Sequence, residues 1–111
     1  MNFQLNYINN NINNYQPNQF NNSLNVKVER YKGFNNEMID YGIIIINKAY
    51  SLMNGVNARA KYIAESFDLK YPQKTKWMCF IYPLGLGGCM FYSKYKIFYY
   101  TNKERILIFN H

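Results

Sequence analysis

The spacing of apolar residues predicts one strand, two helices and then several strands. Residues 25–31 (NVKVERY) alternate valine with charged side chains, which is the pattern of a strand with one wet face. Apolar residues then recur at helical spacing over 37–53 and over 57–71. After a short basic loop, β-like runs follow at 77–82, 88–92, 96–101 and 105–109. This order predicts an α+β fold in which two helices pack on an antiparallel sheet of four to five strands.

The predicted helices have recognisable ends. Asn35 or Asn36 is expected to cap the first helix, and Asn54-Gly55 to end it. Asn57 is expected to cap the second helix. The polar side of the first helix is expected to contain Asp40, Asn47, Lys48 and Ser51.

The last two runs predict a hairpin that is apolar on both faces. With Asn102-Lys103 as a two-residue turn, Tyr99 lies opposite Ile106. Two helices can cover only one face of such a sheet, and the other would then expose a large apolar patch. We therefore expect that face to meet another protein surface, most simply that of a second copy. One face carries Ile97, Tyr99, Ile106 and Ile108, and the other carries Phe98, Tyr100, Leu107 and Phe109.

The N-terminal segment has a different composition. The first 25 residues contain eleven asparagines and no charged side chain. Such a tract cannot bury enough apolar area to offset the entropy lost on ordering. The sequence therefore predicts an Asn-rich, disordered, low-complexity tail over residues 1–24 and a single domain over 25–111.

The chain is basic, with 13 Lys and Arg, 6 Asp and Glu, and a formal net charge of +7. Much of the excess lies in the C-terminal half, where no acidic residue occurs between Asp68 and Glu104. A basic balance permits binding to nucleic acid, anionic lipid or an acidic protein, and selects none of them.

The sequence contains no pattern typical of a catalytic or metal site. The only histidine is the terminal His111, and the acidic residues are scattered singly. Cys79 and Cys89 make neither a disulfide framework nor a zinc spacing. We expect a protein that is not an enzyme and needs no cofactor or metal. With no signal peptide and no long apolar run, it is expected to be soluble and intracellular.

Basic residues with interleaved aromatics leave a second class open. The stretch SKYKIFYY (93–100) has the ingredients of a surface that binds single-stranded nucleic acid. Half of these aromatics are needed for the core, and the usual aromatic RNA-binding motif is absent. Nucleic-acid binding is therefore the alternative reading, below a protein-binding one.

Several stretches, in their order, resemble the small dynein light chains of the eight-kilodalton type. EMIDYGIIIINKAYSLMN resembles the first helix of that family and AKYIAESFDLKY the second. KTKWMCFI resembles a strand, and KYKIFYYTNKERILIF resembles the last hairpin. The resemblance covers about residues 26–110 and leaves the Asn-rich tail out.

This resemblance implies a homodimer whose two sheets pack face to face with the helices outside. One strand crosses to the sister subunit, and a partner peptide adds to it as a further strand. The chain would then be a non-catalytic light chain of a dynein motor, cytoplasmic and associated with microtubules. Its partners would be itself and the dynein intermediate chain or other disordered peptide segments, with no membrane and no nucleic acid.

The resemblance also places a site on this chain. Met78 stands where the family has an interface histidine whose protonation splits the dimer, so that pH switch is expected to be missing here. A chain that dimerises but has lost its peptide groove is a further alternative. The implied peptide-binding residues are Gly87, Gly88, Cys89, Met90 and Phe91 in the crossing strand, Phe98 and Tyr100 in the hairpin, and Val56 and Asn57 at the start of the second helix. The implied dimer interface contains Trp77, Met78 and Cys89.

Overall fold

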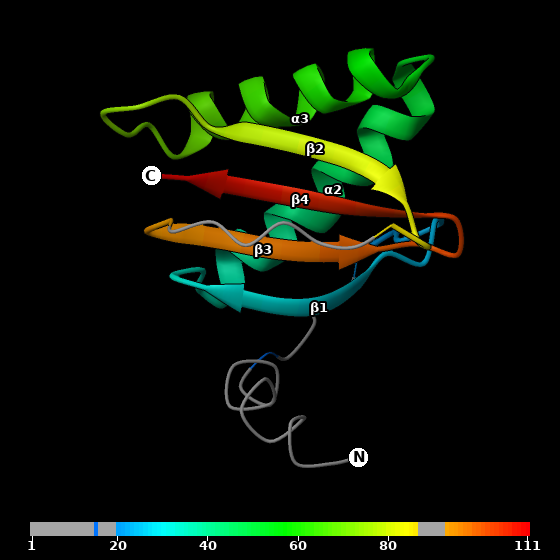
Figure 1. The fold of residues 1–111 in the computed structure, drawn as a ribbon, viewed down its shortest axis with the longest axis horizontal. Coiled ribbons are helices and arrows are strands. Elements are labelled where there is room, and N and C mark those ends of the chain that lie inside the picture. Colours follow the sequence, from blue (N-terminus) through cyan, green and yellow to red (C-terminus); the bar gives the residue numbers. More distant parts are fainter. Residues whose placement is uncertain (1–14, 16–19, 87–92) are drawn as a thin grey trace.

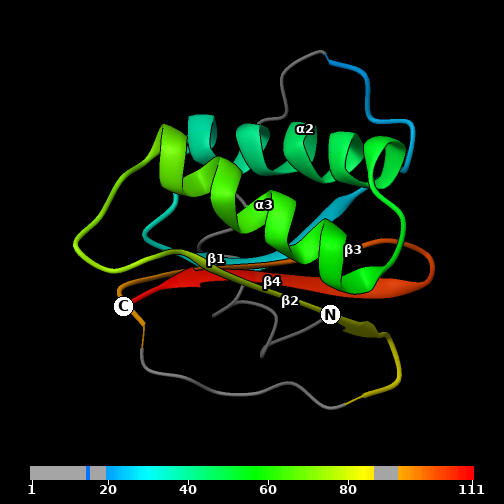
Figure 2. The same ribbon diagram turned by 90° about the horizontal axis from the view of Figure 1, so that it is seen from above.

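The described part of the chain folds as two helices on one face of an antiparallel sheet (Figures 1 and 2). A computed structural model describes Tyr15, residues 20–86 and residues 93–111. The strand order among these residues is β1-β3-β4-β2, which confirms the predicted α+β fold. The predicted strand at 88–92 lies outside the described residues. The elements are β1 (Lys27–Lys32), α2 (Asn36–Leu52), α3 (Val56–Lys70), β2 (Met78–Pro83), β3 (Tyr95–Tyr100) and β4 (Glu104–Asn110).

Strands β3 and β4 form the hairpin at the centre of the sheet. Tyr99 pairs with Ile106, as the two-residue turn predicts. The Thr101 amide donates to the Glu104 carbonyl at 2.9 Å. The Thr101 hydroxyl oxygen in turn accepts from the amides of Lys103 and Glu104, each at 3.1 Å. A side chain and a backbone group therefore both close this turn, and the predicted register is confirmed.

The helix-facing side of the hairpin forms the main core. Ile97, Tyr99, Ile106 and Ile108 are fully buried there. They pack in one cluster with residues of both helices, among them Ile39, Ile43, Ile46, Ile63 and Phe67. These helical residues follow the predicted three-to-four spacing, which confirms the apolar stripes.

The two helices begin in different ways. Asn35 caps α2, and its side-chain oxygen accepts from the Met38 amide at 2.9 Å. Helix α3 begins at Val56, directly after Gly55, and has no side-chain cap. The prediction that Asn57 caps this helix is therefore wrong. Gly55 has a φ of 93°, which favours glycine over any residue with a side chain at the point where the chain turns between the helices.

The C-terminal end of the Asn-rich tail contacts α2. The Tyr15 hydroxyl donates to the Asp40 carboxylate, and Asp40 is only 5% exposed. The prediction that Asp40 lies on the polar side of α2 is therefore wrong. Asn47 accepts from the Leu24 amide at 2.9 Å and donates to the Asn22 side chain at 2.9 Å. These bonds attach the end of the tail to the domain, whereas residues 1–14 and 16–19 lie outside the described part.

Helix α2 approaches the sheet closely at Gly42. The Tyr99 hydroxyl donates to the Ile39 carbonyl at 2.8 Å, which bonds β3 to the helix backbone. A Cβ atom added at Gly42 would lie 2.0 Å from that hydroxyl oxygen. Glycine at this position therefore permits both the close approach and the hydrogen bond. No helix in the described ranges is long and apolar enough to cross a membrane.

Replacing Gly42 with alanine is expected to destabilise the fold. Alanine favours a helix by roughly 1 kcal/mol over glycine. Overpacking a buried site costs about 1 to 3 kcal/mol, and the Tyr99 ring is fully buried. We expect Gly42→Ala to lower the free energy of unfolding, measured by urea denaturation and circular dichroism.

Gly85→Ala is the matched control, because an added Cβ at Gly85 has no atom within 4 Å. A Gly42→Ala protein as stable as the Gly85→Ala protein would contradict the close approach of α2 and β3.

Candidate functional site

The two edges of the sheet differ in their suitability for pairing with another strand. Among the described residues, β2 pairs only with β4, and its register runs without a shift from Met78 to Pro83. Its sequence, MCFIYP, carries no charge. The other edge, β1, has an irregularity between Val28 and Arg30 and a lysine at each end. Lysines and bulges discourage pairing at an edge, whereas a regular apolar edge invites it. Strand β2 is therefore the edge that suits an added strand.

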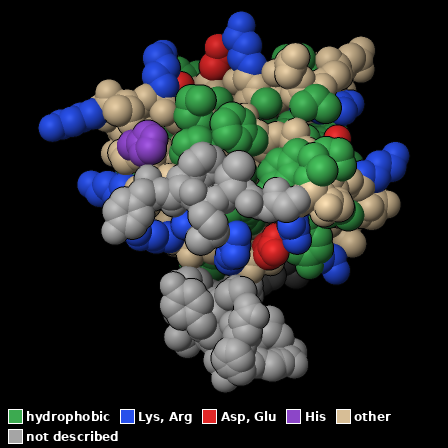
Figure 3. Space-filling view, in the orientation of Figure 1, with side chains coloured by type: hydrophobic (Ala, Val, Ile, Leu, Met, Phe, Trp, Pro, Cys, Tyr) green, Lys and Arg blue, Asp and Glu red, His purple; other side chains and the backbone are tan. Residues whose placement is uncertain are grey.

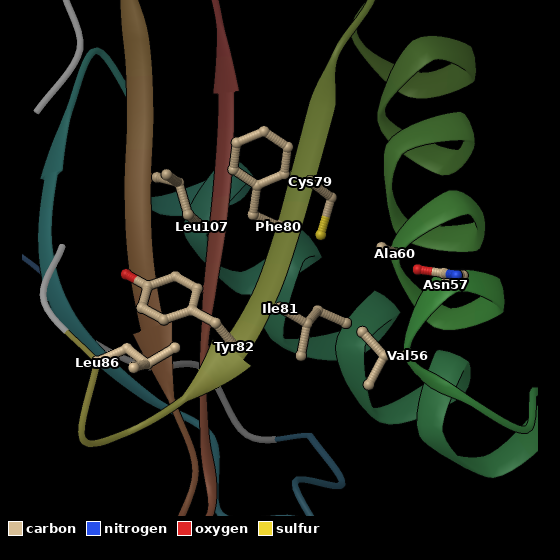
Figure 4. Close-up of a pocket in the computed structure, with 9 residues that line it drawn as sticks. All are labelled: Val56, Asn57, Ala60, Cys79, Phe80, Ile81, Tyr82, Leu86 and Leu107. Atoms are coloured by element: carbon tan, nitrogen blue, oxygen red, sulfur yellow. The ribbon is translucent and has the colours of Figure 1, made fainter. Parts of the chain in front are cut away.

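A groove of about 410 Å³ lies along β2, beside the beginning of α3 (Figure 4). Cys79 and Ile81 project from β2 toward α3, while Phe80 and Tyr82 project to the opposite side, toward Leu107. This alternation follows from the two-residue period of a strand. A strand added at the edge would therefore have apolar neighbours on both of its faces. On the α3 side the groove is lined by Val56, Asn57, Ala60, Cys79 and Ile81.

Cys79 contributes packing to the groove. It is 9% exposed, and burial raises the pKa of its thiol. The thiolate is the reactive form of cysteine, so a raised pKa makes this thiol a poor nucleophile at neutral pH. Within the described ranges, no three His, Cys, Asp or Glu side chains gather as a possible metal site. The wall of this groove is mostly apolar and offers surface for contact.

The face of the sheet opposite the helices, here called the outer face, is covered in part. On this face Phe98, Leu107 and Phe109 are at most 4% exposed and Tyr100 is half-buried. The expected contact of this face with a second copy stays a prediction. The Arg30 guanidinium lies 4.3 Å from the centre of the Phe98 ring. The Phe80 ring lies 5.5 Å from that of Phe109. Side chains of both edge strands thus contact this hairpin face.

Exposed apolar side chains occur instead along β2 and the turn after it. Met78 and Phe80 are 43% and 41% exposed on the outer face of β2. Leu84 and Leu86 follow in the turn, at 37% and 56%. Apolar side chains gather over the β2–β4 half of the outer face in Figure 3. We call Met78, Phe80, Leu84 and Leu86 the β2 apolar patch.

The predicted peptide-binding residues fall into three groups. Val56 and Asn57 line the groove beside β2. Phe98 lies away from that groove and is buried under Arg30. Tyr100 is half-buried and borders a separate hollow with Lys27. Gly87, Gly88, Cys89, Met90 and Phe91 lie outside the described residues, so the crossing strand stays a prediction.

The three residues predicted for the dimer interface lie in different parts of the chain. Trp77 is 2% exposed and donates from its ring nitrogen to the Tyr71 carbonyl at 2.7 Å, so it belongs to the helix-side core of a single chain. Its neighbour Met78 belongs to the β2 apolar patch. Cys89 is not among the described residues. The sequence prediction missed Phe80 and Ile81, although the alternation in MCFIYP already places them on opposite sides of an edge strand.

Comparison with known proteins adds no relative. The sequence matches no protein-family model, and none of the curated proteins is significantly similar to it. The likeness to the dynein light chains therefore stays a prediction from the residues quoted above.

Proposed function

We propose that the chain is a non-catalytic homodimeric hub of the dynein light chain type, which binds extended peptide segments by strand addition. The observation that carries the proposal is the edge of β2, which is uncharged, regular and unpaired among the described residues. Unpaired N–H and C=O groups on such an edge are satisfied by an added strand. The groove beside this edge supplies apolar surface for the side chains of that strand.

In the proposed dimer, the strand that adds to β2 is the crossing segment 87–91 of the sister chain, which lies outside the described residues. The partner peptide adds in turn to the outer edge of that segment. Val56 and Asn57, on the first turn of α3, stand on the far side of the groove from β2. They are placed to contact the peptide on the side that faces away from the sheet.

The β2 apolar patch is the proposed contact between the two sheets. Burying it in a two-fold interface would remove Phe80 and Met78 from water and favour association. The β1–β3 half of the outer face contains Arg30, Lys32 and Lys96, and burying such charges is costly. The two sheets therefore meet through their β2–β4 halves, and the charged halves remain at the rim.

A dimer of this kind has two equivalent grooves. A partner with two binding segments, or two partners that are themselves linked, then gains effective concentration without strong single contacts. This behaviour suits a hub that holds disordered segments of a dynein intermediate chain together.

Phe80→Glu is expected to dissociate the dimer, because it places a charge in the proposed apolar contact. The expected loss is about 3 kcal/mol, or roughly a hundredfold in the dimer Kd. Sedimentation velocity over a range of concentrations measures this constant, and circular dichroism checks that the variant folds.

Leu69→Glu is the matched control, since Leu69 is 87% exposed on α3 and lies outside the patch. A wild-type chain that sediments as a monomer at micromolar concentration would refute the proposed dimer. An equal effect of both substitutions would refute the proposed contact.

Val56→Arg is expected to weaken peptide binding by about tenfold while the dimer persists, because Val56 stands on the far side of the groove from β2, where the peptide is proposed to bind. The ligand is a labelled peptide from a dynein intermediate chain, and fluorescence anisotropy reports its binding to the full chain.

Leu52→Arg serves as the control, since Leu52 is 64% exposed at the end of α2 and does not line this groove. A dimer that binds no such peptide, or binds it equally well with Val56→Arg, would argue for a groove that has lost its ligand.

A further inference from the structure

Three cationic side chains lie together on the outer face of β1 and β3. Lys32 pairs directly with Lys96 across the two strands, and Arg30 pairs with Phe98 two residues further along. Residues two apart on a strand share a face, so all three side chains lie on one side of the sheet. We call Arg30, Lys32 and Lys96 the basic cluster.

Two of these cations, Lys32 and Lys96, stand directly opposite each other. Like charges directly opposite each other in an antiparallel pair are destabilising. Partial burial, together with the charges of Arg30 and Lys32, lowers the pKa of Lys96. The fold therefore keeps three cations close enough to repel one another.

The acidic residue of these two strands is already engaged. Glu29 is the single acid in β1, and β3 contains none. Its carboxylate forms an ion pair with Arg105 of β4 at 3.3 Å. This ion pair shows a carboxylate bound to an arginine on the same sheet. Arg105 is not part of the basic cluster.

The position of Arg30 favours a carboxylate ligand over a nucleic-acid base. Its guanidinium lies over the Phe98 ring at 4.3 Å, which restrains the group. A guanidinium stacked in this way keeps its N–H edge for two parallel bonds to a carboxylate. Single-stranded nucleic acid needs exposed aromatic rings on which bases stack, and Phe98 is 2% exposed beneath the arginine.

We propose that Arg30, Lys32 and Lys96 bind a carboxylate-rich segment of a partner protein on the outer face of β1 and β3. Lys and Arg side chains gather over this half of the face in Figure 3, opposite the β2 apolar patch. The site is at the other edge of the sheet from the groove beside β2. It goes beyond the proposed strand addition, and it is complete within one chain.

The test measures binding of fluorescein-labelled deca-glutamate to the full chain by anisotropy, at low and at physiological salt. Lys32→Gln with Lys96→Gln removes two charges and leaves Arg30 over Phe98. We expect this variant to lose about tenfold in affinity. Its melting temperature checks that the variant is folded.

The control pair is Lys48→Gln with Lys61→Gln, which removes the same charge from exposed positions on α2 and α3. Its affinity for deca-glutamate is expected to change less than about twofold. Equal losses of affinity in both variants would show that binding depends only on the net charge of the protein, and would overturn the proposal.

Two further probes test whether the site prefers another kind of polyanion. Deca-uridine or phosphatidylserine vesicles that bind more tightly than deca-glutamate, and depend on the same lysines, would overturn the assignment to a carboxylate segment. Absence of deca-glutamate binding at low salt would overturn it as well. A monomeric Phe80→Glu protein that still binds deca-glutamate would support this site, whatever the outcome for the dimer.

Discussion

The central hairpin is apolar on both faces, and the rest of the fold follows from the need to cover it. On one face, α2 and α3 bury Ile97, Tyr99 and Ile106. The hydrogen bond from Tyr99 to the Ile39 carbonyl, made possible by Gly42, holds α2 against β3. On the other face, side chains of both edge strands contact the hairpin, Arg30 at the Phe98 ring and Phe80 at the Phe109 ring. Exposed apolar side chains lie along β2 and the turn after it.

The outer face consequently has two unlike halves. The β2 half presents apolar side chains beside a regular strand edge, which suits an added strand and a second sheet. The β1 half presents the basic cluster on an irregular strand, which suits an acidic ligand and discourages strand pairing. The two proposals use opposite edges of one sheet for this reason, and they do not compete for the same side chains.

Local patterns in the sequence were sufficient for the parts of the fold that depend on neighbours in the chain. Asn35 caps α2 through a residue three positions away, and Asn102-Lys103 sets the hairpin register. Contacts between distant residues were not predictable in this way. Tyr15, in the Asn-rich tail, donates to the buried Asp40, and strand order places Arg30 beside the buried Phe98. The value of β2 as a site likewise depends on its edge position, which its own sequence does not contain.

Hydrogen exchange at the two sheet edges tests the central claim, that β2 is the edge at which this protein associates. The measurement is amide exchange by NMR on the full chain at a low and a high protein concentration. Amides of β2 that point away from β4 are predicted to exchange quickly in dilute solution and slowly at high concentration. Outward amides of β1 are predicted to exchange quickly in both. Fast exchange of the outward β2 amides at every concentration, or protection that develops at β1 instead, would contradict the claim.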